Sequence, residues 1–452
     1  MTERREHWGS RLGFVLAAAG SAVGVGSLWR FPYIAGQNGG GAFIILYLIF
    51  TFMLGLPVFI AELIIGRRTQ KSAVLAYTQL THKSQWKFIG WLNVLSCLII
   101  LSFYAVVSGW GVSYTLMSLT GFTDGRTPDQ ISGVFDTLYS SADINLLWLG
   151  LFLLINVGVV LAGVRKGIEH WSKILMPALF IMLIGLLSFS LTLDGLPQAL
   201  HFIFYPDWGK VSPAMILSAL GMAFFTLSVA LGIILTYGSY MQSKEDVPKT
   251  AFTVACMTVF VSILASVMIF PIVFTFGYTP EAGPGLVFKT MPVLFAKLPG
   301  TLILSTIFFI LFVFTALTSS ISLMEMLVSN LMENFNFNRK KAVVFTALGA
   351  FILGIPSALS GSGLLFGQWK LIYGRDFFET MDFITSNWFM PIAGFLTTVF
   401  VGWVIDKQLT KAEFEAGTKL VRWYRPWFFM VRYVAPLVVA VIILQQAGII
   451  RV

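Results

Sequence analysis

Apolar stretches recur along the whole chain, each close to the ~20 residues that a helix needs to cross the hydrocarbon core of a bilayer. This feature limits the possible folds more than any other. Only 11% of the 452 residues are charged, whereas soluble proteins carry roughly 25%. We therefore expect an all-α membrane protein with eleven transmembrane helices. The expected helices cover residues 11–36, 41–66, 88–119, 145–164, 167–192, 213–241, 249–278, 300–333, 341–358, 383–405 and 426–449.

Lysine and arginine gather at the N-terminus and in alternate connections, and this distribution predicts the orientation. The connection at 120–144 is acidic instead. Because basic residues favour the cytoplasmic side, we expect a multi-pass protein of the cell membrane with a cytoplasmic N-terminus and an extracellular C-terminus. The net charge of +9 then faces the anionic leaflet of the lipid bilayer and calls for no nucleic acid. The basic segments are 1–11, 67–87, 165–173, 244–249, 339–341 and 407–425.

Residues that would support other kinds of chemistry are few. Cys97 and Cys256 cannot supply a disulfide framework or a four-ligand zinc site. Neither HExxH nor GxxxxGK[ST] occurs, so the usual signatures of zinc hydrolysis and ATP-driven transport are missing. Glu62 is the one acid that we place at mid-depth in a span, which is too little for an intramembrane hydrolase. A channel would show a repeated filter or a periodic polar pore helix, and neither is found. We therefore expect that this protein is not an enzyme.

Two of the expected helices carry helix-weakening sequences at mid-depth. The first has three glycines within Gly20–Ser27 (GSAVGVGS), and the sixth has two hydroxyls and a glycine within Phe225–Gly232 (FTLSVALG). The glycines alone also fit a helix-packing face of small residues. The two breaks correspond in two five-helix halves, however, and such pairs mark the site of secondary transporters. Unwound backbone that lines a cavity offers carbonyls to a cation and N–H groups to a carboxylate.

Five motifs resemble those of the neurotransmitter:sodium symporters. They are Arg5–Trp8 (REHW), Leu28–Pro32 (LWRFP), Asn38–Phe43 (NGGGAF), Phe225–Ser228 (FTLS) and Thr315–Ser322 (TALTSSIS). Within this family the chain looks like the bacterial amino-acid branch, which includes transporters of several hydrophobic amino acids. The resemblance implies a Na+-coupled symporter that imports such amino acids by alternating access. A same-fold secondary transporter of another family with a different small substrate is the alternative, and the LWRFP motif argues against it.

The resemblance also implies a LeuT-type fold. Residues 1–452 would form one transporter domain, with helices 1–5 (11–192) and 6–10 (213–405) as 5+5 inverted repeats. Helices 1 and 6 would be discontinuous, and helix 11 (426–449) would lie outside the repeats. Many members of the family have twelve helices, so a count of eleven departs from their pattern.

Two Na+ sites follow from the resemblance. The first would use Ala22, Ser27, Thr226 and Thr258, together with the carboxylate of the substrate. The second would use carbonyls of Gly20, Val23 and Thr315 and hydroxyls of Thr318 and Ser319. The family usually has asparagine at the positions of Ser27 and Thr258, so either the backbone closes in, or water completes the shell, or the first site is weak. For Thr318 and Ser319, the alternative is a hydroxyl bonded to its own helix.

The implied substrate is a hydrophobic L-amino acid, for example Leu, Trp or Phe. Monoamine-transporting relatives carry aspartate at position 24 to replace the carboxylate that their substrates lack, whereas Gly24 leaves this charge to the substrate. Uncharged side chains around the expected site favour apolar or aromatic substrates. The implied substrate residues are Ala22, Gly24, Val25, Gly26, Ile100, Tyr104, Phe225, Thr226, Ser228, Leu231, Ser320 and Leu323.

Charged residues at both ends of the expected site are implied to form gates. Arg30 would pair with Asp382 on the outer side, and Arg5 with Glu333 on the inner side, where Trp8 would pack nearby. Glu62 would satisfy backbone N–H groups of the broken helices.

Two features of the expected helices keep more than one interpretation. The fifth helix contains Gly167 and Pro177, which predict either local unwinding or an ordinary kink. Tyr47 and Ser262 match the halide region of the family, but Met222 replaces the glutamine of chloride-dependent relatives, so the sequence leaves chloride dependence open.

Overall fold

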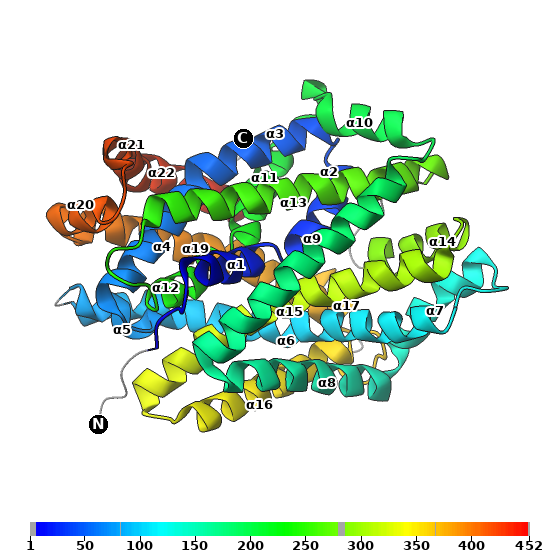
Figure 1. The fold of residues 1–452 in the computed structure, drawn as a ribbon, viewed down its shortest axis with the longest axis horizontal. Helices are drawn as coiled ribbons and strands as arrows, with labels where there is room; N and C mark the ends of the chain where they lie inside the picture. Colours follow the sequence, from blue (N-terminus) through cyan, green and yellow to red (C-terminus); the bar gives the residue numbers. More distant parts are fainter. Residues whose placement is uncertain (1–5, 82, 279–284, 367, 451–452) are drawn as a thin grey trace.

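The computed structural model describes residues 6–81, 83–278, 285–366 and 368–450, which form helices and, within these ranges, no strand (Figure 1). Nine described helical segments are long and apolar enough to cross a membrane. A bent pair, α1 (Arg11–Ala22) followed by η1 (Gly26–Arg30) and α2 (Phe31–Gln37), makes a tenth. The expected count of eleven requires α11 (Pro213–Thr226) and α12 (Ile233–Gly238) to form one interrupted span.

The nine spans agree with the expected helices to within four residues, except that residues 377–382 and 421–425 extend the tenth and eleventh expected helices at their starts. Four of the nine contain short π-helical turns. The spans are α3 (Gly41–Phe50) with η2 (Thr51–Gly55) and α4 (Leu56–Thr69); η3 (Ser84–Trp86) with α6 (Lys87–Leu119); α8 (Ala142–Leu161); η4 (Val164–Glu169) with α9 (His170–Ser190); α13 (Val247–Thr275); α15 (Thr301–Phe335); α16 (Arg339–Ala358); α18 (Phe377–Ile384) with η7 (Thr385–Phe389), α19 (Met390–Val399) and η8 (Phe400–Val404); and η9 (Val421–Trp423) with α21 (Tyr424–Phe429), η10 (Met430–Val434) and α22 (Ala435–Gln446).

Short helices occupy the connections between the spans. They are α5 (Ala73–Gln79), α7 (Pro128–Ser140), α10 (Leu196–Phe204), η5 (Trp208–Lys210), η6 (Leu286–Thr290), α14 (Met291–Ala296), α17 (Trp369–Tyr373) and α20 (Lys407–Glu415).

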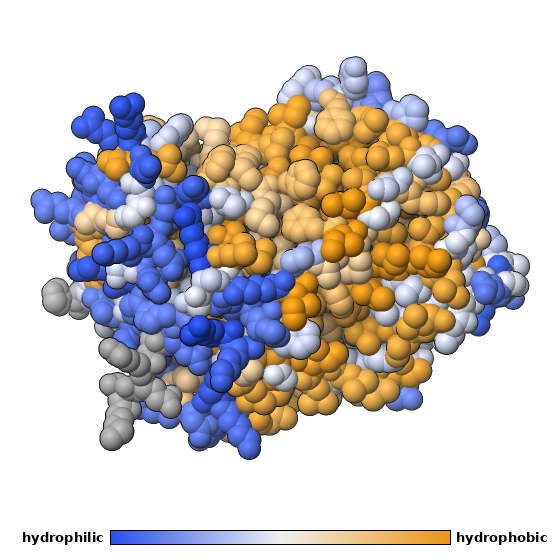
Figure 2. Space-filling view, in the orientation of Figure 1, coloured by the Kyte–Doolittle hydropathy of each residue, from blue (hydrophilic) through white to orange (hydrophobic). Residues whose placement is uncertain are grey.

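The surface of the molecule carries a broad apolar band. Figure 2 shows this band across the middle, with polar residues gathered most densely at the end that contains the N-terminus. Many side chains of the band are large and exposed, among them Leu154, Ile181 and Ile352. Exposed apolar surface on this scale requires a hydrocarbon environment, so the band marks the part of the molecule that faces lipid.

The two interrupted helices lie in the interior of the bundle. α1 packs against α9, α13 and α15, while α12 packs against α4 and α15. The long helix α6 runs beside α15, α8 and α16. Because other helices surround them, the unwound segments meet protein groups rather than lipid, which is the condition for non-helical backbone at membrane depth.

Candidate functional site

The first break separates α1 from η1. Val23 leaves the helical region, with φ −81° and ψ 61°, and the chain direction changes by 48° across the break. The hydroxyl of Ser27 donates a hydrogen bond to the carbonyl of Ala22 at 3.3 Å. Carbonyls at the end of α1 and N–H groups at the start of η1 that lack the usual helical partners therefore lie close together at the break.

The second break covers residues 227–232, between α11 and α12. Ser228, Ala230 and Gly232 adopt left-handed backbone, with φ values of 52°, 64° and 68°. Such backbone is costly for residues other than glycine and persists only when its surroundings hold it. Here the carboxylate of Glu62 accepts hydrogen bonds from the N–H groups of Ala230 (2.5 Å) and Leu235 (3.3 Å).

Cys97 of α6 also contacts the second break. Its thiol donates a hydrogen bond to the carbonyl of Leu231 at 3.2 Å. A fully buried carboxylate on α4 and a fully buried thiol on α6 thus stabilise the unwound backbone from two sides.

Both breaks contact each other and α15 through serine hydroxyls. The hydroxyl of Ser228 donates to the carbonyl of Ser21 at 2.9 Å. The hydroxyl of Ser319 lies 3.1 Å from the same carbonyl and 3.4 Å from that of Gly20. On the other side of the first break, the N–H of Val25 donates to the Tyr104 hydroxyl at 3.3 Å. The structure therefore brings α1, η1, the 227–232 segment, α6 and α15 together at one point.

A cavity of about 30 Å³ lies at this meeting point, which is room for little more than a water molecule. Nine of the twelve expected substrate residues line it. Val25 and Thr226 are adjacent in sequence to lining residues, whereas Ser320 faces elsewhere. Ser21, Ile233 and Ser319 also line the cavity, although Ser21 and Ile233 were absent from the expected sites and Ser319 was expected only as a sodium ligand. The lining residues are Ser21, Ala22, Gly24, Gly26, Ile100, Tyr104, Phe225, Ser228, Leu231, Ile233, Ser319 and Leu323.

Ser320 is an expected substrate residue that does not line the cavity. Its hydroxyl donates to the side-chain oxygen of Asn156 on α8 at 2.6 Å and lies 3.1 Å from the carbonyl of Leu317. Consecutive residues of an α-helix point about 100° apart, so Ser319 faces the cavity while Ser320 faces α8.

The expected ligands of the second Na+ site lie between α1 and α15. Thr318 donates its hydroxyl to the carbonyl of Thr315 at 3.0 Å, as in the alternative of a bond within its own helix. Ser319 instead reaches α1, as described above. A Cβ atom on Gly20 would lie 3.2 Å from Cβ of Thr318, so glycine allows the two helices to pack this closely. Uncharged carbonyl and hydroxyl oxygens are ligands that suit a hard cation.

The expected side chains of the first Na+ site are bonded to backbone. Thr226 donates to the carbonyl of Met222 and Thr258 to that of Val254, both at 2.9 Å. The hydroxyl of Thr226 also lies 3.1 Å from that of Tyr47. Tyr47 in turn lies 3.5 Å from Ser262, so the hydroxyls expected near the halide region form one buried group.

The outer gate residues form an ion pair. Nη1 of Arg30 donates to Asp382 at 2.9 Å, and the guanidinium lies 4.5 Å from the ring centroid of Phe225. Beyond this pair lies a cavity of about 540 Å³, whose lining includes Trp29, Arg375 and Glu379.

Three residues separate this outer cavity from the small central one. Gly26, Tyr104 and Phe225 line both cavities, so they form the partition between them. A Cβ atom on Gly26 would lie 2.8 Å from the ring of Phe225, which shows how closely the ring covers the first break.

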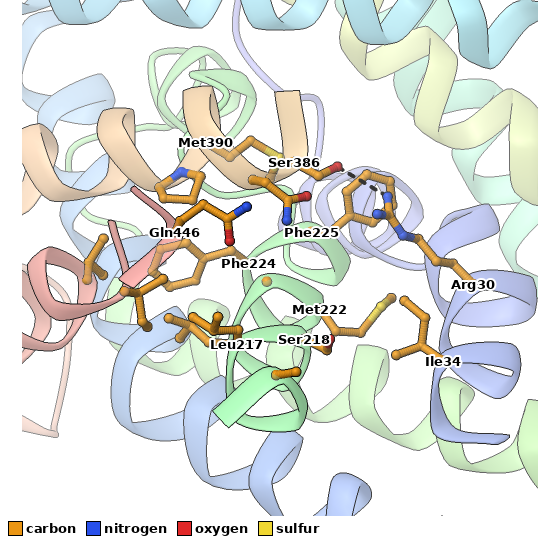
Figure 3. Close-up of a pocket in the computed structure, with 17 residues that line it drawn as sticks. Arg30, Ile34, Leu217, Ser218, Met222, Phe224, Phe225, Ser386, Met390 and Gln446 are labelled. Atoms are coloured by element: carbon orange, nitrogen blue, oxygen red, sulfur yellow. Dashed lines mark hydrogen bonds between the residues drawn. The ribbon is translucent and has the colours of Figure 1, made fainter. Parts of the chain in front are cut away.

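A third cavity, of about 270 Å³, lies on another side of the Arg30 guanidinium, between α11, the η7–α19 region and α22 (Figure 3). Arg30 donates to the hydroxyl of Ser386 at 3.3 Å on the wall of this cavity. Arg30, Phe225 and Asn387 line both this cavity and the outer one. The outer gate therefore stands between two cavities, and its ion pair is held by contacts on both sides.

On the inner side, Trp8 is buried under α12. Its indole N–H donates to the carbonyl of Tyr237 at 3.0 Å, and its backbone N–H donates to that of Tyr240 at 3.2 Å. Glu333 accepts a hydrogen bond from the N–H of Ser72 at 2.8 Å. Its expected partner Arg5 lies outside the described residues.

Two carboxylates join the N-terminal segment to the start of the η4–α9 span. Glu6 accepts from the N–H of Val164, and Glu169 accepts from the N–H of Gly9, both at 2.6 Å. Glu169 also accepts from the hydroxyl of Ser10 at 2.8 Å. Each acid thus satisfies free N–H groups near the start of the other segment. Neither acid was among the expected site residues.

The expected hinge in the fifth helix lies within continuous helix. Gly167 belongs to the π-helical turn η4, and Pro177 lies inside α9. A Cβ atom on Gly167 would overlap the carbonyl oxygen of Val159, so glycine permits close packing here. The structure shows no unwinding between Gly167 and Pro177.

Glu325 is a further buried acid within a span, besides Glu62, which was expected as the one acid at mid-depth. It is fully buried on α15, pairs with Arg339 and accepts a hydrogen bond from the hydroxyl of Tyr240 at 2.7 Å. The rule that singled out Arg30, a charge inside an apolar stretch, would have found it.

Comparisons with known proteins agree with this architecture. The family model of the sodium:neurotransmitter symporter family matches residues 5–124 and 135–451. The "uncharacterized sodium-dependent transporter YhdH" of Bacillus subtilis is 37% identical over 451 residues, which cover 99% of each chain. The human "sodium- and chloride-dependent GABA transporter 2" is 26% identical over 94% of this chain and 77% of its own.

Among solved structures, the crystal structure of MhsT in complex with L-phenylalanine superposes with a TM-score of 0.91 and 39% identity. The match covers 98% of this chain and all of that one. The matched family model and the relatives agree with each other and with the paired helix breaks. The chain belongs to the sodium:neurotransmitter symporter family.

Proposed function

We propose that this protein is a Na+-coupled symporter that imports hydrophobic or aromatic L-amino acids by alternating access. The observation that carries the proposal is the cavity where both helix breaks meet. Its lining offers backbone polar groups, hydroxyls and an apolar wall, but no charged side chain. Such a lining suits a zwitterionic amino acid, whose two charges can meet backbone groups, hydroxyls and Na+ while its apolar side chain meets the wall.

The site has a distinct place for each part of such a substrate. The carboxylate would meet the N–H groups at Val25 and Gly26 and the Tyr104 hydroxyl. The amine would meet carbonyls of Ala22, Phe225 and Thr226 and the hydroxyl of Ser228. The apolar side chain would contact Ile100, Leu231 and Leu323, which all line the cavity. That the similar MhsT was crystallised with L-phenylalanine supports this class of substrate.

Two Na+ ions would share the breaks with the substrate. Ala22, Ser27, Thr226 and Thr258 would hold the first ion together with the substrate carboxylate. Gly20, Val23, Thr315, Thr318 and Ser319 would hold the second between α1 and α15. Tyr47 and Ser262 match the halide region of the family, whereas Met222 replaces the glutamine of chloride-dependent relatives. Uptake with and without chloride decides between the two.

The partition and the gates support alternating access. The central cavity is too small for an amino acid side chain, so Tyr104 and Phe225 must move apart to admit one. Opening on the outer side would break the Arg30–Asp382 pair. Opening on the inner side would displace Trp8 from α12, with Arg5 and Glu333 as a further inner pair.

The architecture that we propose has eleven spans in one domain of residues 1–452. α1–α2 and α11–α12 would be the discontinuous first helices of two inverted repeats, with the last span outside them. The N-terminus would be cytoplasmic and the C-terminus extracellular. The dense polar surface at the N-terminal end supports this orientation.

Uptake of labelled tryptophan and leucine into proteoliposomes tests the proposal. An imposed Na+ gradient should drive accumulation, while an equal K+ gradient should not. Replacing chloride by gluconate in a parallel series measures any chloride dependence. Competition by decarboxylated leucine should be weak, because the amine alone lacks the carboxylate. Equal uptake with K+, or equal competition by the decarboxylated analogue, would contradict the proposal.

A further inference from the structure

The connection between α16 and α18 exposes an unusual number of large apolar side chains. Leu364, Leu371 and Ile372 are 73%, 85% and 69% exposed. Monomeric soluble surfaces rarely present so many neighbouring apolar side chains without a partner. The residues that we name the loop patch are Leu364, Leu365, Phe366, Leu371, Ile372 and Tyr373.

The loop patch continues a surface that faces lipid. α16 ends at Ala358, and this helix exposes Phe345, Leu348 and Ile352 along its length. The connection therefore leaves α16 at the edge of the bilayer. Exposed apolar and aromatic side chains beside Lys370 are the mixture that favours the interface between headgroups and hydrocarbon.

The loop patch is attached firmly to α18. The indole N–H of Trp369 donates to the hydroxyl of Thr380 at 2.9 Å. The rings of Phe366 and Phe377 stack with centroids 5.2 Å apart, and the N–H of Phe378 donates to the hydroxyl of Ser360 at 3.2 Å. Any force on the loop patch therefore acts directly on the first turns of α18.

α18 also carries the acid of the outer gate. Asp382 lies in its second turn and pairs with Arg30. The start of α18 is fixed on its other side by Asp376, which caps the helix and accepts a hydrogen bond from the hydroxyl of Tyr139 at 2.7 Å. A lipid-facing surface and a gate residue thus belong to one short rigid unit.

We propose that the loop patch docks into the interface of the bilayer leaflet on the side of the outer gate and sets the position of α18. The thickness of the bilayer then acts on the Arg30–Asp382 pair and hence on access to the outer cavity. The inferred contact with lipid depends only on the exposed residues of the loop patch. The inferred effect on the gate also rests on the proposed function.

Environment-sensitive fluorescence tests the contact with lipid. In a Cys256→Ser background, where Cys97 is fully buried, Leu371→Cys would carry the label NBD. Asp129→Cys, exposed on α7, is the matched control. In phosphatidylcholine vesicles, the label at 371 should emit at shorter wavelength and be quenched by shallow spin-labelled lipid. The label at 129 should be quenched by aqueous iodide.

Two outcomes of this experiment would overturn the contact with lipid. One is iodide quenching at 371 equal to that at 129. The other is protection from both quenchers together with cross-linking between two copies through residue 371, which would make a second copy the partner.

The effect on the gate has its own measurement, which needs no transport. Asn387→Cys, on the wall of the outer cavity, would be labelled by a membrane-impermeant thiol reagent in palmitoleoyl and in erucoyl phosphatidylcholine vesicles. A mismatch between the hydrophobic thickness of the protein and that of the bilayer costs a fraction of a kcal/mol per Å. The labelling rate should therefore differ about threefold between the two bilayers. Adding Leu371→Asp and Ile372→Asp should remove the difference.

Ile372→Ser alone is a milder variant with the same expected direction. Equal labelling rates in the two bilayers with the loop patch intact would overturn the effect on the gate. If the protein with the intact loop patch takes up no amino acid but is still labelled at different rates in the two bilayers, the result would count against the proposed function and not against this inference.

Discussion

The hydroxyl of Ser319 occupies the space that a Cβ atom on Gly24 would need. The two residues come from α15 and from the first break, and both line the central cavity. Glycine at position 24 is therefore favoured by packing against Ser319 as well as by the charge argument for an amino-acid substrate. A larger residue at this position must displace the Ser319 hydroxyl from α1, where the second Na+ site is proposed.

The packing of Gly24 predicts a stability defect with a specific rescue. Gly24→Ala should destabilise the folded protein by about 1–3 kcal/mol, the usual cost of overpacking. Ser319→Ala in the same chain should recover part of this loss, because it removes the overlapping hydroxyl. Thermal unfolding in detergent measures both. Gly158→Ala is the control, since no neighbouring atom lies within 4 Å of its added Cβ. A double variant no more stable than Gly24→Ala would contradict the packing argument.

Glu62 should be irreplaceable even by glutamine. Its two oxygens accept hydrogen bonds from Ala230 and Leu235, and an amide offers only one acceptor for two buried N–H groups. Leaving one buried donor without a partner costs about 1–3 kcal/mol. Glu62→Gln should lower the unfolding temperature measurably, while Glu415→Gln, at a partly exposed pair with Lys411, should not. Equal unfolding temperatures would show that Glu62 does not support the second break.

The outer gate predicts a separation of transport from Na+ binding. Asp382→Ala removes the partner of Arg30 without touching a proposed Na+ ligand. Uptake should fall about fivefold, the effect of roughly 1 kcal/mol on a gate equilibrium, while Na+ affinity should change little. Uptake assays and calorimetry on the same preparation measure the two effects. Asp207→Ala, in an exposed pair with Lys210, is the control. Unchanged uptake would remove Asp382 from the gate.

Na+ and the amino acid should bind cooperatively, because the substrate carboxylate is a proposed ligand of the first ion. Desolvation offsets much of the attraction, so the net coupling should be ~1–3 kcal/mol, or roughly 5- to 150-fold in affinity. Thr258→Ala should reduce this factor, whereas Ser319→Ala should weaken the second ion without abolishing it. Binding of labelled amino acid across a Na+ titration, with K+ holding ionic strength constant, measures the coupling. A flat titration with the unmutated protein would exclude the shared carboxylate.

The sequence by itself determined the membrane class, most of the span positions and the location of both breaks. These features are local: an apolar stretch of sufficient length forms a helix in lipid wherever it lies, and clustered glycines and hydroxyl residues weaken the helix that contains them. The family motifs added the family, which the comparisons established, and a list of site residues.

Only the tertiary structure decided which side chains face the central cavity. Ser319 and Ser320 are adjacent serines that no sequence pattern distinguishes. The orientation of α15 about its own axis places Ser319 at the cavity and Ser320 against Asn156. The same holds for Glu169 and Glu325, which accept hydrogen bonds from Gly9 and Tyr240 in distant segments. Pairings of this kind depend on how helices pack and rotate against each other, which no local pattern encodes.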